Sequence, residues 1–369
     1  QVGKLPIGVQ QRVEIIKLLY RHADILILDE PTALLTPQES DSLFEVVNKL
    51  KSQGKSIIFI THKLKEVYQI ADRMTVMRGG RRIITTTPQE TDEKALTELM
   101  VGKSVERLQR NKREISGDVV LSVEDLQVSG SGHRNLIDGV SFEIRAGEIL
   151  GVAGIEGNGQ TQLAQGLFGH IHTAGGEIRY AGQSIRNHST REIRSLGVGS
   201  IPDDRQGMGL ILNFNIAENI ILNEFAQKPY AKNWAWQRWG EIHRHAGDVV
   251  QEFDIRTAGV SAFVSALSGG NQQKVVVGRE LSVPLKLLIA SQPTRGVDFN
   301  SAEFIQRKIL EAAGGGTAVL LFSSDLDELL NISDRIMVLH RGRNAGIVGG
   351  GEATKEQLGS MMLGLHKGG

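Results

Sequence analysis

Residues 154–162 read GIEGNGQTQ and almost match the phosphate-binding pattern G-x-x-x-x-G-K-[ST]. The glycines of that pattern let successive backbone N–H groups wrap around a phosphate. Gly154, Gly159 and Thr161 stand where the pattern requires them, whereas Gln160 replaces the lysine. The match is therefore either accidental or the mark of a nucleotide site that has lost its positively charged clamp.

The composition is that of a globular chain long enough for two or more domains. Hydrophobic residues make up 40% and charged residues 23% of the 369 positions, as is ordinary for a soluble protein. The chain has 42 basic residues (lysine plus arginine) and 42 acidic residues (aspartate plus glutamate). This balance argues against a nucleic-acid-binding surface that extends over the whole chain. The absence of cysteine excludes disulfides, thiolate nucleophiles and cysteine-ligated metals. No run of about 18 apolar residues predicts a membrane span.

The chain repeats itself with an offset of 262 residues. LPIGVQQRVEI begins at Leu5 and LSGGNQQKVVV begins at Leu267, and the same register is kept downstream. Over residues 5–81, roughly 19 of 77 positions are identical without a gap, which chance similarity would not sustain. We therefore predict two copies of one fold.

Short apolar runs recur in both copies at this offset. ILIL (25–28) corresponds to LLI (287–289), and SIIFI (56–60) corresponds to AVLLF (318–322). Such runs are typical of buried parallel strands, and helical patterns lie between them. The predicted fold class is therefore α/β with a mostly parallel sheet.

The two copies differ in length. The second extends back to about Leu121, whereas the first has only four residues before Leu5. Because the chain starts abruptly inside a motif, we expect the front of the first copy, with its own phosphate loop, to be missing. Residues 102–119 are charged and weakly apolar, which is typical of a linker. We thus expect a partial first domain over 1–101 and a second domain over 120–369.

An apolar strand ends in two carboxylates in ILILDEPT (25–32). Phosphoryl transfer needs one acid to hold Mg²⁺ and another to orient or deprotonate the attacking water. Asp29 is the candidate for the first role and Glu30 for the second. His62, in FITHKL, lies just past the next strand, where ligands of such sheets bind, and could contact a γ-phosphate. Taken alone, the acidic pair would be an acidic turn and the histidine a structural one.

A serine, two glycines and a helix start meet in LSGGNQQ (267–273). Free N–H groups at a helix N-terminus favour an anion, and the hydroxyl of Ser268 adds a further polar group. As an isolated glycine turn this pattern is weak, but as one member of an ordered set it is specific.

Together, the loop at 154–161, LSGGNQQ, ILILDEPT and THKL resemble the motifs of the ATP-binding-cassette (ABC) ATPase family. The resemblance covers essentially the whole chain. It implies two tandem P-loop NTPase domains, the first incomplete, each with a mostly parallel sheet and a helical subdomain. The tandem arrangement, LPIGVQQRVEI and QPTRGVD are more narrowly similar to the ATPase subunits of simple-sugar and nucleoside importers. The stretch ILILDEPTALLTPQE favours the nucleoside branch.

In this family two cassettes stack head to tail, and each ATP lies between the phosphate loop of one and the signature of the other. The resemblance implies ATP and Mg²⁺ as ligands, with Mg²⁺ held by Asp29 and Thr161, and Glu30 and His62 as catalytic residues. The residues that it implies for nucleotide binding are Gly154, Gly157, Asn158, Gly159, Gln160, Thr161, Gln162, Ser268, Gly269, Gly270 and Asn271.

The second site, built on the loop GIEGNGQTQ, is degraded at every catalytic position. Ser291, Gln292 and Ser324 replace the strand-end carboxylates and the histidine. The signature that would face this site, LPIGV, carries Pro6 and Ile7 instead of a serine and a glycine. We expect nucleotide binding there with little turnover, because glutamine can still hydrogen-bond a phosphate but lacks the ammonium charge.

The first site is the opposite. It has Asp29, Glu30 and His62 and would face the intact signature LSGGN, so we expect hydrolysis there. Asp203, in the second copy, falls near the glutamine that in this family contacts Mg²⁺ and the membrane partner.

An importer subunit implies transmembrane permease subunits, an extracytoplasmic substrate-binding protein and a place on the cytoplasmic face of the cell membrane, without nucleic acid. A soluble tandem ATPase acting on ribosomes or DNA is the alternative. The short linker, the zero net charge and the degraded site disfavour it. A binding module without ATPase activity is a third hypothesis for the chain as it stands.

Two further stretches carry expectations. NEFAQKPYAKNWAWQRWGEIHRHA (223–246) contains Trp234, Trp236 and Trp239. Burial of these rings in a helical subdomain is the favoured interpretation, and a contact surface for membrane subunits is the other. The glycines at 349–351 predict a flexible connection to the tail.

Overall fold

The computed structural model describes residues 13–14, 17, 23–32, 37–61, 63–78, 80–101, 115, 117–130, 135–233 and 236–365. The chain divides into two compact units, residues 1–107 and 108–369, and each is described here by itself. The division lies inside the segment expected to be a linker. Among the described residues, no helix combines the length and the apolar character needed to cross a membrane.

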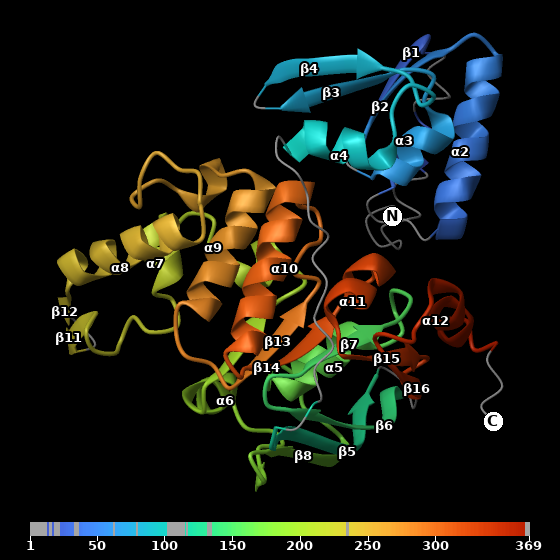
Figure 1. Ribbon diagram of the computed structural model, residues 1–369. Helices are drawn as coiled ribbons and strands as arrows, with labels where there is room; N and C mark the ends of the chain where they lie inside the picture. The colour runs from blue at the N-terminus through green and yellow to red at the C-terminus, as the bar shows by residue number, and fades with distance from the viewer. Residues whose placement is uncertain are drawn as a thin grey trace. The chain divides into compact units, whose positions relative to one another are not determined.

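The larger unit is built on a six-stranded sheet (Figure 1). Its strand order is β10-β13-β14-β7-β15-β16, and only the edge strand β16 is antiparallel to its neighbour. Strand β7, which leads into the predicted phosphate loop, therefore lies inside the sheet. The strands are β7 (Ile149–Ala153), β10 (Val198–Ile201), β13 (Leu287–Ser291), β14 (Ala318–Phe322), β15 (Arg335–His340) and β16 (Arg343–Gly349).

One face of this sheet is covered by helix α5 and a second, antiparallel sheet of order β6-β5-β8-β9. Helix α5 contributes Leu163 and Leu167 to a core that also contains Ile137 of β6 and Ile289 of β13. The elements on this side are β5 (Val119–Ser129), β6 (Asn135–Arg145), α5 (Gln160–Leu167), β8 (Gly175–Tyr180), β9 (Gln183–Ser184) and α6 (Thr190–Ser195).

The other face packs on a helical layer and a helical subdomain. Alternate residues of β13 divide between the two cores: Leu288 and Ala290 face this layer, whereas Leu287 and Ile289 face α5. Burial on both faces explains why the strand is a continuous apolar run. The elements are η2 (Arg205–Gly209), α7 (Ile216–Ile220), β11 (Ala231–Asn233), β12 (Trp236–Gln237), α8 (Trp239–Glu252), η3 (Val264–Ala266), α9 (Gly269–Leu281), α10 (Phe299–Gly314), α11 (Leu326–Ile332) and α12 (Lys355–Met362).

The smaller unit repeats the last part of the larger one. Strand β1, helix α2, strand β2 and helix α3 begin and end 262 residues before β13, α10, β14 and α11. Strands β1 and β2 are parallel, and the pair Ile25–Ser56 corresponds to the pair Leu287–Ala318. The elements are β1 (Ile25–Asp29), α2 (Pro37–Ser52), β2 (Ser56–Ile60), α3 (Leu64–Ile70), β3 (Met74–Arg78), β4 (Arg81–Thr86) and α4 (Glu93–Val101).

One face of the β1–β2 pair is apolar and open. Ile25 is 65% exposed, whereas its counterpart Leu287 is 1% exposed, and Ile27, Ile58 and Ile60 are exposed as well. In the larger unit this face is covered by α5 and the antiparallel sheet. The described residues of the smaller unit contain no corresponding cover and no helical subdomain. Such an apolar face makes this unit prone to associate.

The glycines at 349–351 do not form a flexible connection, so that expectation was wrong. Gly349 is the last residue of β16, and the N–H of Gly350 donates to the carbonyl of Asp334 at 2.7 Å. A Cβ at Gly350 would collide with the carbonyl of Ser333. The glycine is needed because two backbone segments approach closely there.

Candidate functional site

The predicted phosphate loop connects β7 to α5 in the larger unit. Gly157 and Gly159 have φ angles of 90° and 107°, which L side chains rarely adopt. A Cβ at Gly159 would lie 2.8 Å from the carbonyl oxygen of Leu136. The spacing of the glycines therefore serves a tight backbone turn that ends at the first residue of a helix, as a phosphate-binding loop requires.

A distant turn holds this loop in place. The backbone N–H of Arg341 donates to Oδ1 of Asn158 at 3.1 Å, and that of Gly342 donates to the Asn158 carbonyl at 3.0 Å. The Gly342 carbonyl accepts in turn from the N–H of Asp138 at 2.8 Å. The turn between β15 and β16 is thus part of the site. Sequence reasoning missed it, although Arg341 and Gly342, both with positive φ, form a recognisable turn.

Gln160, which replaces the lysine, is buried against the loop. A Cβ placed on Gly154 would lie 2.6 Å from its Nε2 atom. The amide therefore lies against the first glycine of the loop and offers a neutral donor there. Glycine at position 154 is what leaves room for it.

The hydroxyl of Thr161 donates to Oδ2 of Asp203 at 2.8 Å. Asp203 follows β10, and Thr161 lies in the first turn of α5. A hydroxyl and a carboxylate at the carboxyl end of a parallel sheet are oxygen ligands suited to Mg²⁺. The glycine turn, the helix start and this oxygen pair fit a Mg²⁺–nucleotide, with the loop and Gln160 at the phosphates and Thr161 beside the cation.

The residues that the sequence analysis expects to replace the strand-end acids and the histidine of a second site lie close together. Ser291 ends β13 and is buried. Oε1 of Gln292 accepts from the backbone N–H and the hydroxyl of Ser324, at 3.2 and 3.1 Å. Where an acid and an imidazole would activate water, this site has an amide bonded to a hydroxyl, and neither group is a base at neutral pH.

Glu30 has the same backbone geometry as Gln292. Their φ angles are 44° and 49°, and each N–H donates at 2.8 Å to the last residue of the neighbouring strand, Ile60 or Phe322. Positive φ at a non-glycine residue stores strain and clusters at functional sites. Asp29 is exposed at the end of β1. His62 lies outside the described residues, so its meeting with Glu30 stays a prediction.

A buried glutamate supports this strand end in each unit. The hydroxyl of Thr32 donates to Glu66 at 2.6 Å, and that of Thr294 donates to Glu328 at 2.9 Å. Burial, aided by the nearby negative charge of Asp325, raises the pKa of Glu328 to about 7, although hydrogen bonds to the carboxylate oppose the shift. The folded larger unit therefore retains a proton that the unfolded chain releases between the usual pKa and about 7.

We expect Glu328→Gln to stabilise the protein at pH 8 but not near pH 5. Because the pKa of Glu328 is higher in the folded than in the unfolded state, the free energy of unfolding falls as the pH rises towards the folded-state pKa. At pH values above that pKa, the loss is at most about 3 kcal/mol. Glutamine removes this loss and keeps an oxygen for Thr294. Thermal unfolding at both pH values measures it, with the exposed Glu356→Gln as control. An equal shift at both pH values would contradict the prediction.

The signature residues form the start of α9. Asn271 donates through Nδ2 to Oγ of Ser268 at 2.9 Å. A Cβ on Gly270 would lie 2.8 Å from Oδ2 of Asp298, at the start of α10. A Cβ on Gly269 would lie 3.1 Å from the guanidinium of Arg205. The two glycines are therefore needed for close packing as well as for any contact with an anion.

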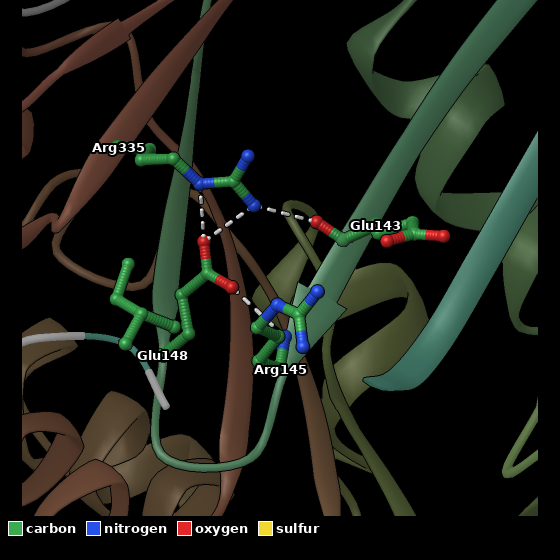
Figure 2. Close-up of a pocket in the computed structure, with 5 residues that line it drawn as sticks. Glu143, Arg145, Glu148 and Arg335 are labelled. Atoms are coloured by element: carbon green, nitrogen blue, oxygen red, sulfur yellow. Dashed lines mark hydrogen bonds and ion pairs between the residues drawn. The ribbon is translucent and has the colours of Figure 1, made fainter. Parts of the chain in front are cut away.

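A cavity of about 280 Å³ is lined by none of the predicted site residues, and Figure 2 shows the side chains that line it. It is lined by Ile115, Glu143, Arg145, Glu148 and Arg335. Arg335 pairs with the buried Glu148 at 2.7 Å and donates to the Glu143 carbonyl at 2.8 Å. The other carboxylate oxygen of Glu148 accepts from the N–H of Arg145 at 2.8 Å. This ion pair joins β15 to the turn between β6 and β7, which is a structural role.

Two of the three tryptophans are exposed. Trp236 is 70% and Trp239 is 46% exposed, so burial of these rings in the helical subdomain was a wrong expectation. Trp234 lies outside the described residues. Phe214 and Phe263 are also exposed, and they lie close together because the N–H of Val264 donates to the Phe214 carbonyl at 3.2 Å. The helical subdomain thus presents aromatic surface.

Comparison with known proteins identifies close relatives. A model of the ABC transporter family matches residues 137–295. The nucleoside import ATP-binding protein NupA of Lactococcus lactis subsp. cremoris is 45% identical over 98% of this chain and 72% of its own length. The guanosine import ATP-binding protein NupO of Bacillus subtilis is 43% identical over 99% of this chain and 71% of its own. The ribose import ATP-binding protein RbsA 2 of Streptomyces coelicolor is 39% identical over 100% of this chain and 69% of its own.

Solved structures share the fold. A nucleotide-free ATP-binding cassette from an ABC transporter matches with a TM-score of 0.56 and 21% identity, over 67% of this chain and 96% of that one. A dimeric post-hydrolysis cassette bound to ADP and phosphate matches with a TM-score of 0.55 and 18% identity, over 62% and 98%. At these identities the likeness concerns the fold alone.

Proposed function

Because the chain belongs to the ABC transporter family of ATP-binding proteins, we propose that it is the ATPase subunit that energises import of nucleosides or simple sugars. The observation that carries the proposal is 45% identity to a nucleoside import protein over 98% of the chain. The nucleoside import relatives are somewhat more similar than the ribose import relative, at 45 and 43% against 39%, which favours a nucleoside as cargo.

The function is tested by inactivating the chain in its own cell and following uptake of labelled guanosine and ribose. Loss of guanosine uptake with normal ribose uptake is the expected result. Normal uptake of both, with the protein bound to ribosomes, would instead favour the soluble alternative.

The smaller unit is the corresponding part of a second cassette in this proposal. Two observations support this. The first and last residues of four successive elements, β1 to α3, lie 262 positions before those of β13 to α11, and the two strand pairs have the same register. Chain segments that merely resemble each other in composition would not keep the same boundaries over such a length. Residues 102–119 then link the two cassettes, and the second one extends over 120–369.

Hydrolysis belongs to the first site in this proposal. Asp29 would hold Mg²⁺, Glu30 would orient or deprotonate water, and His62 would contact the γ-phosphate. The support is the position of Glu30, whose strained backbone is held to β2 as that of Gln292 is held to β14.

The second site binds nucleotide and hydrolyses it little. The loop from Gly154 to Thr161 supplies backbone N–H groups, and Gln160 adds a neutral donor. Thr161 and Asp203 provide oxygen atoms for Mg²⁺. These groups would hold the phosphate chain of a bound ATP, while the strand-end Ser291 and Gln292 lack the carboxylates that would hold Mg²⁺ and activate water.

Gln160→Lys is expected to tighten ATP binding at this site roughly tenfold, or about 1.4 kcal/mol, without adding hydrolysis. The reason is that an ammonium adds charge to the loop while the strand-end positions remain unchanged. Titration calorimetry with MgATP and a phosphate-release assay measure the two quantities. Gln165→Lys adds the same charge farther along α5 and serves as control. A doubled hydrolysis rate in Gln160→Lys would show that the site is not degraded.

Membrane permease subunits, and through them an extracytoplasmic substrate-binding protein, are the partners in this proposal. The names of the import relatives support such an assembly, which would place the protein on the cytoplasmic face of the membrane. The exposed aromatic surface of the helical subdomain, with Trp236, Trp239, Phe214 and Phe263, is the contact area that we assign to these subunits.

A further inference from the structure

The loop at 154–162 of the larger unit carries a negative charge and no basic residue. Glu156 is its only charged residue, and the Glu156 side chain is 65% exposed. Gln160 offers a neutral amide where a lysine would offer an ammonium, and Asp203 places a second carboxylate beside Thr161. A phosphate chain held by this loop would be close to two carboxylates. Besides Mg²⁺, a positively charged side chain would therefore stabilise it.

Arg295 brings such a side chain to the loop. Its Nη2 atom lies 3.6 Å from Oε1 of Glu156, and the Arg295 side chain is 28% exposed. The N–H of Arg295 donates to the carbonyl of Gln292 at 3.1 Å, and its carbonyl accepts from Nη1 of Arg205 at 3.5 Å. For its guanidinium, the contact with Glu156 is the only ion pair or hydrogen bond among the described residues. The backbone of Arg295 is thus anchored on both sides, while the guanidinium is loosely held.

The ion pair with Glu156 can be exchanged for a contact with a phosphate. An exposed ion pair contributes little to stability, so breaking it costs little. A guanidinium binds a phosphate through two parallel N–H···O bonds, and such bidentate contacts are among the strong hydrogen bonds of proteins. Because Glu156 belongs to the loop itself, the Arg295 guanidinium already lies beside the proposed place of the phosphates. The exchange requires rotation of one side chain and no movement of the backbone.

The two copies of the repeat differ at this position. The offset of 262 residues pairs Arg295, in QPTRGVD, with Ala33, in EPTALLT. The arginine therefore occurs in the copy that has lost the acids and the histidine, and the alanine occurs in the copy that retains Glu30. A group needed for hydrolysis would be expected in the copy with Glu30. An arginine beside the degraded loop instead fits a role in holding the nucleotide.

Two other arginines follow β15, near the loop. Arg341 contacts Asn158 through its backbone N–H, at 3.1 Å, and its side chain is exposed. The Arg343 guanidinium is bound to Asp138, with Nη2 at 2.6 Å from Oδ2. Among the described residues, the guanidinium contact that reaches the loop is that of Arg295. Arg343 therefore serves as a control for the loss of a positive charge near the site.

We propose that Arg295 takes the place of the missing lysine at the second site: when nucleotide binds, its guanidinium leaves Glu156 and binds the phosphate chain. Glu156 holds this guanidinium beside the loop when no nucleotide is bound. The inference rests on the proposed function, because it requires that the loop binds nucleotide. It adds a charged binding residue that the phosphate-binding pattern, which ends at Thr161, does not contain.

Titration calorimetry of the 369-residue chain with MgATP tests the proposal. We expect Arg295→Gln to weaken binding by about tenfold, because a charged, bidentate contact is lost. Arg295→Lys keeps the charge but loses the planar fork, so it should bind about threefold more weakly than the wild type. Arg343→Gln removes a nearby positive charge and should change the affinity by less than about twofold. Thermal melting shows whether each variant is folded, and if Arg295→Gln unfolds, an unchanged affinity of Arg295→Lys would overturn the proposal.

A double variant separates direct binding of phosphate from mere neutralisation of Glu156. If Arg295 binds the phosphates, Glu156→Gln/Arg295→Gln should still bind MgATP at least about threefold more weakly than the wild type. Wild-type affinity of this double variant would overturn the proposal, as would equal affinities of Arg295→Gln and Arg343→Gln.

Gln160→Lys separates failure of this inference from failure of the proposed function. If Gln160→Lys binds MgATP and the wild type does not, the nucleotide site stands but Arg295 does not replace the lysine. If neither of them binds MgATP, the proposed nucleotide site fails, and the inference fails with it.

Discussion

Glu30→Gln is expected to lower ATP hydrolysis by about 100-fold or more while ATP stays bound, since general-base catalysis contributes a factor of this order or larger. Glu30 is the strand-end carboxylate placed to polarise water in the proposed first site. The amide has the same shape but is not a base. The larger unit already carries glutamine at the corresponding position, Gln292, with the same φ and the same backbone hydrogen bond. The substitution should therefore leave the fold intact.

The assay needs a phosphate loop for the first site. Residues 1–101 contain none, so the 369-residue chain alone should release almost no phosphate. The chain is therefore joined at its N-terminus to a cassette segment with an intact G-x-x-x-x-G-K-[ST] loop, and steady-state phosphate release and ATP retention are measured. Glu45→Gln, on the exposed face of α2, is the control, and Gln292→Glu should create no new activity. Near-normal turnover in Glu30→Gln would refute the site assignment.

Glu280→Ala is expected to destabilise the larger unit by about 3–5 kcal/mol, the cost of breaking a buried ion pair. Glu280 is fully buried near the end of α9. Its carboxylate accepts from Nη1 of Arg194 at 2.9 Å, Nε of Arg279 at 3.0 Å, Nδ2 of Asn223 at 3.0 Å and the N–H of Ser200 at 3.2 Å. The signature helix is joined through it to β10, α6 and the helical subdomain.

The charges explain the size of this effect. Burial alone would raise the pKa of Glu280, but Arg279 and Arg194 outweigh it and hold that pKa below its usual value. Removing the carboxylate leaves the buried Arg279 guanidinium without its carboxylate partner. Because the folded pKa is lowered, the stabilisation is present above the unfolded pKa and is lost as the pH falls through the folded one.

Denaturant unfolding at neutral pH measures the loss of stability. Glu241→Ala breaks the exposed pair with Arg244 on α8, at 2.9 Å, and should cost no more than about 0.5 kcal/mol. If Glu280→Ala lowers the free energy of unfolding as little as Glu241→Ala does, the hydrogen bonds and ion pairs of Glu280 do not stabilise the larger unit as we expect. Glu280→Gln, which keeps an acceptor for Ser200, should fall between the two.

The sequence alone determined the features that local patterns encode. SIIFI and AVLLF are parallel strands with the predicted bounds, 56–60 and 318–322, because a short apolar run between polar residues is itself the signal of such a strand, but only AVLLF is buried. The offset of 262 residues predicted which segments of the two copies have the same structure. It pairs Glu30 with Gln292, and these two residues have similar positive φ angles. The tight turn before α5, with Gly157 and Gly159 at positive φ, could be predicted because glycine spacing reflects backbone geometry.

Tertiary structure decided what depends on contacts between distant residues. The bond from Arg341 to Asn158 joins positions 183 apart, and no local pattern announces it. The same holds for Arg205 beside Gly269 and for the close backbone approach at Gly350, which the sequence suggested was a flexible connection. Exposure of Trp236 and Trp239 also depends on what else covers the subdomain. Side-chain type sets the tendency to be buried, but only the packing of the whole chain decides which surfaces find a partner.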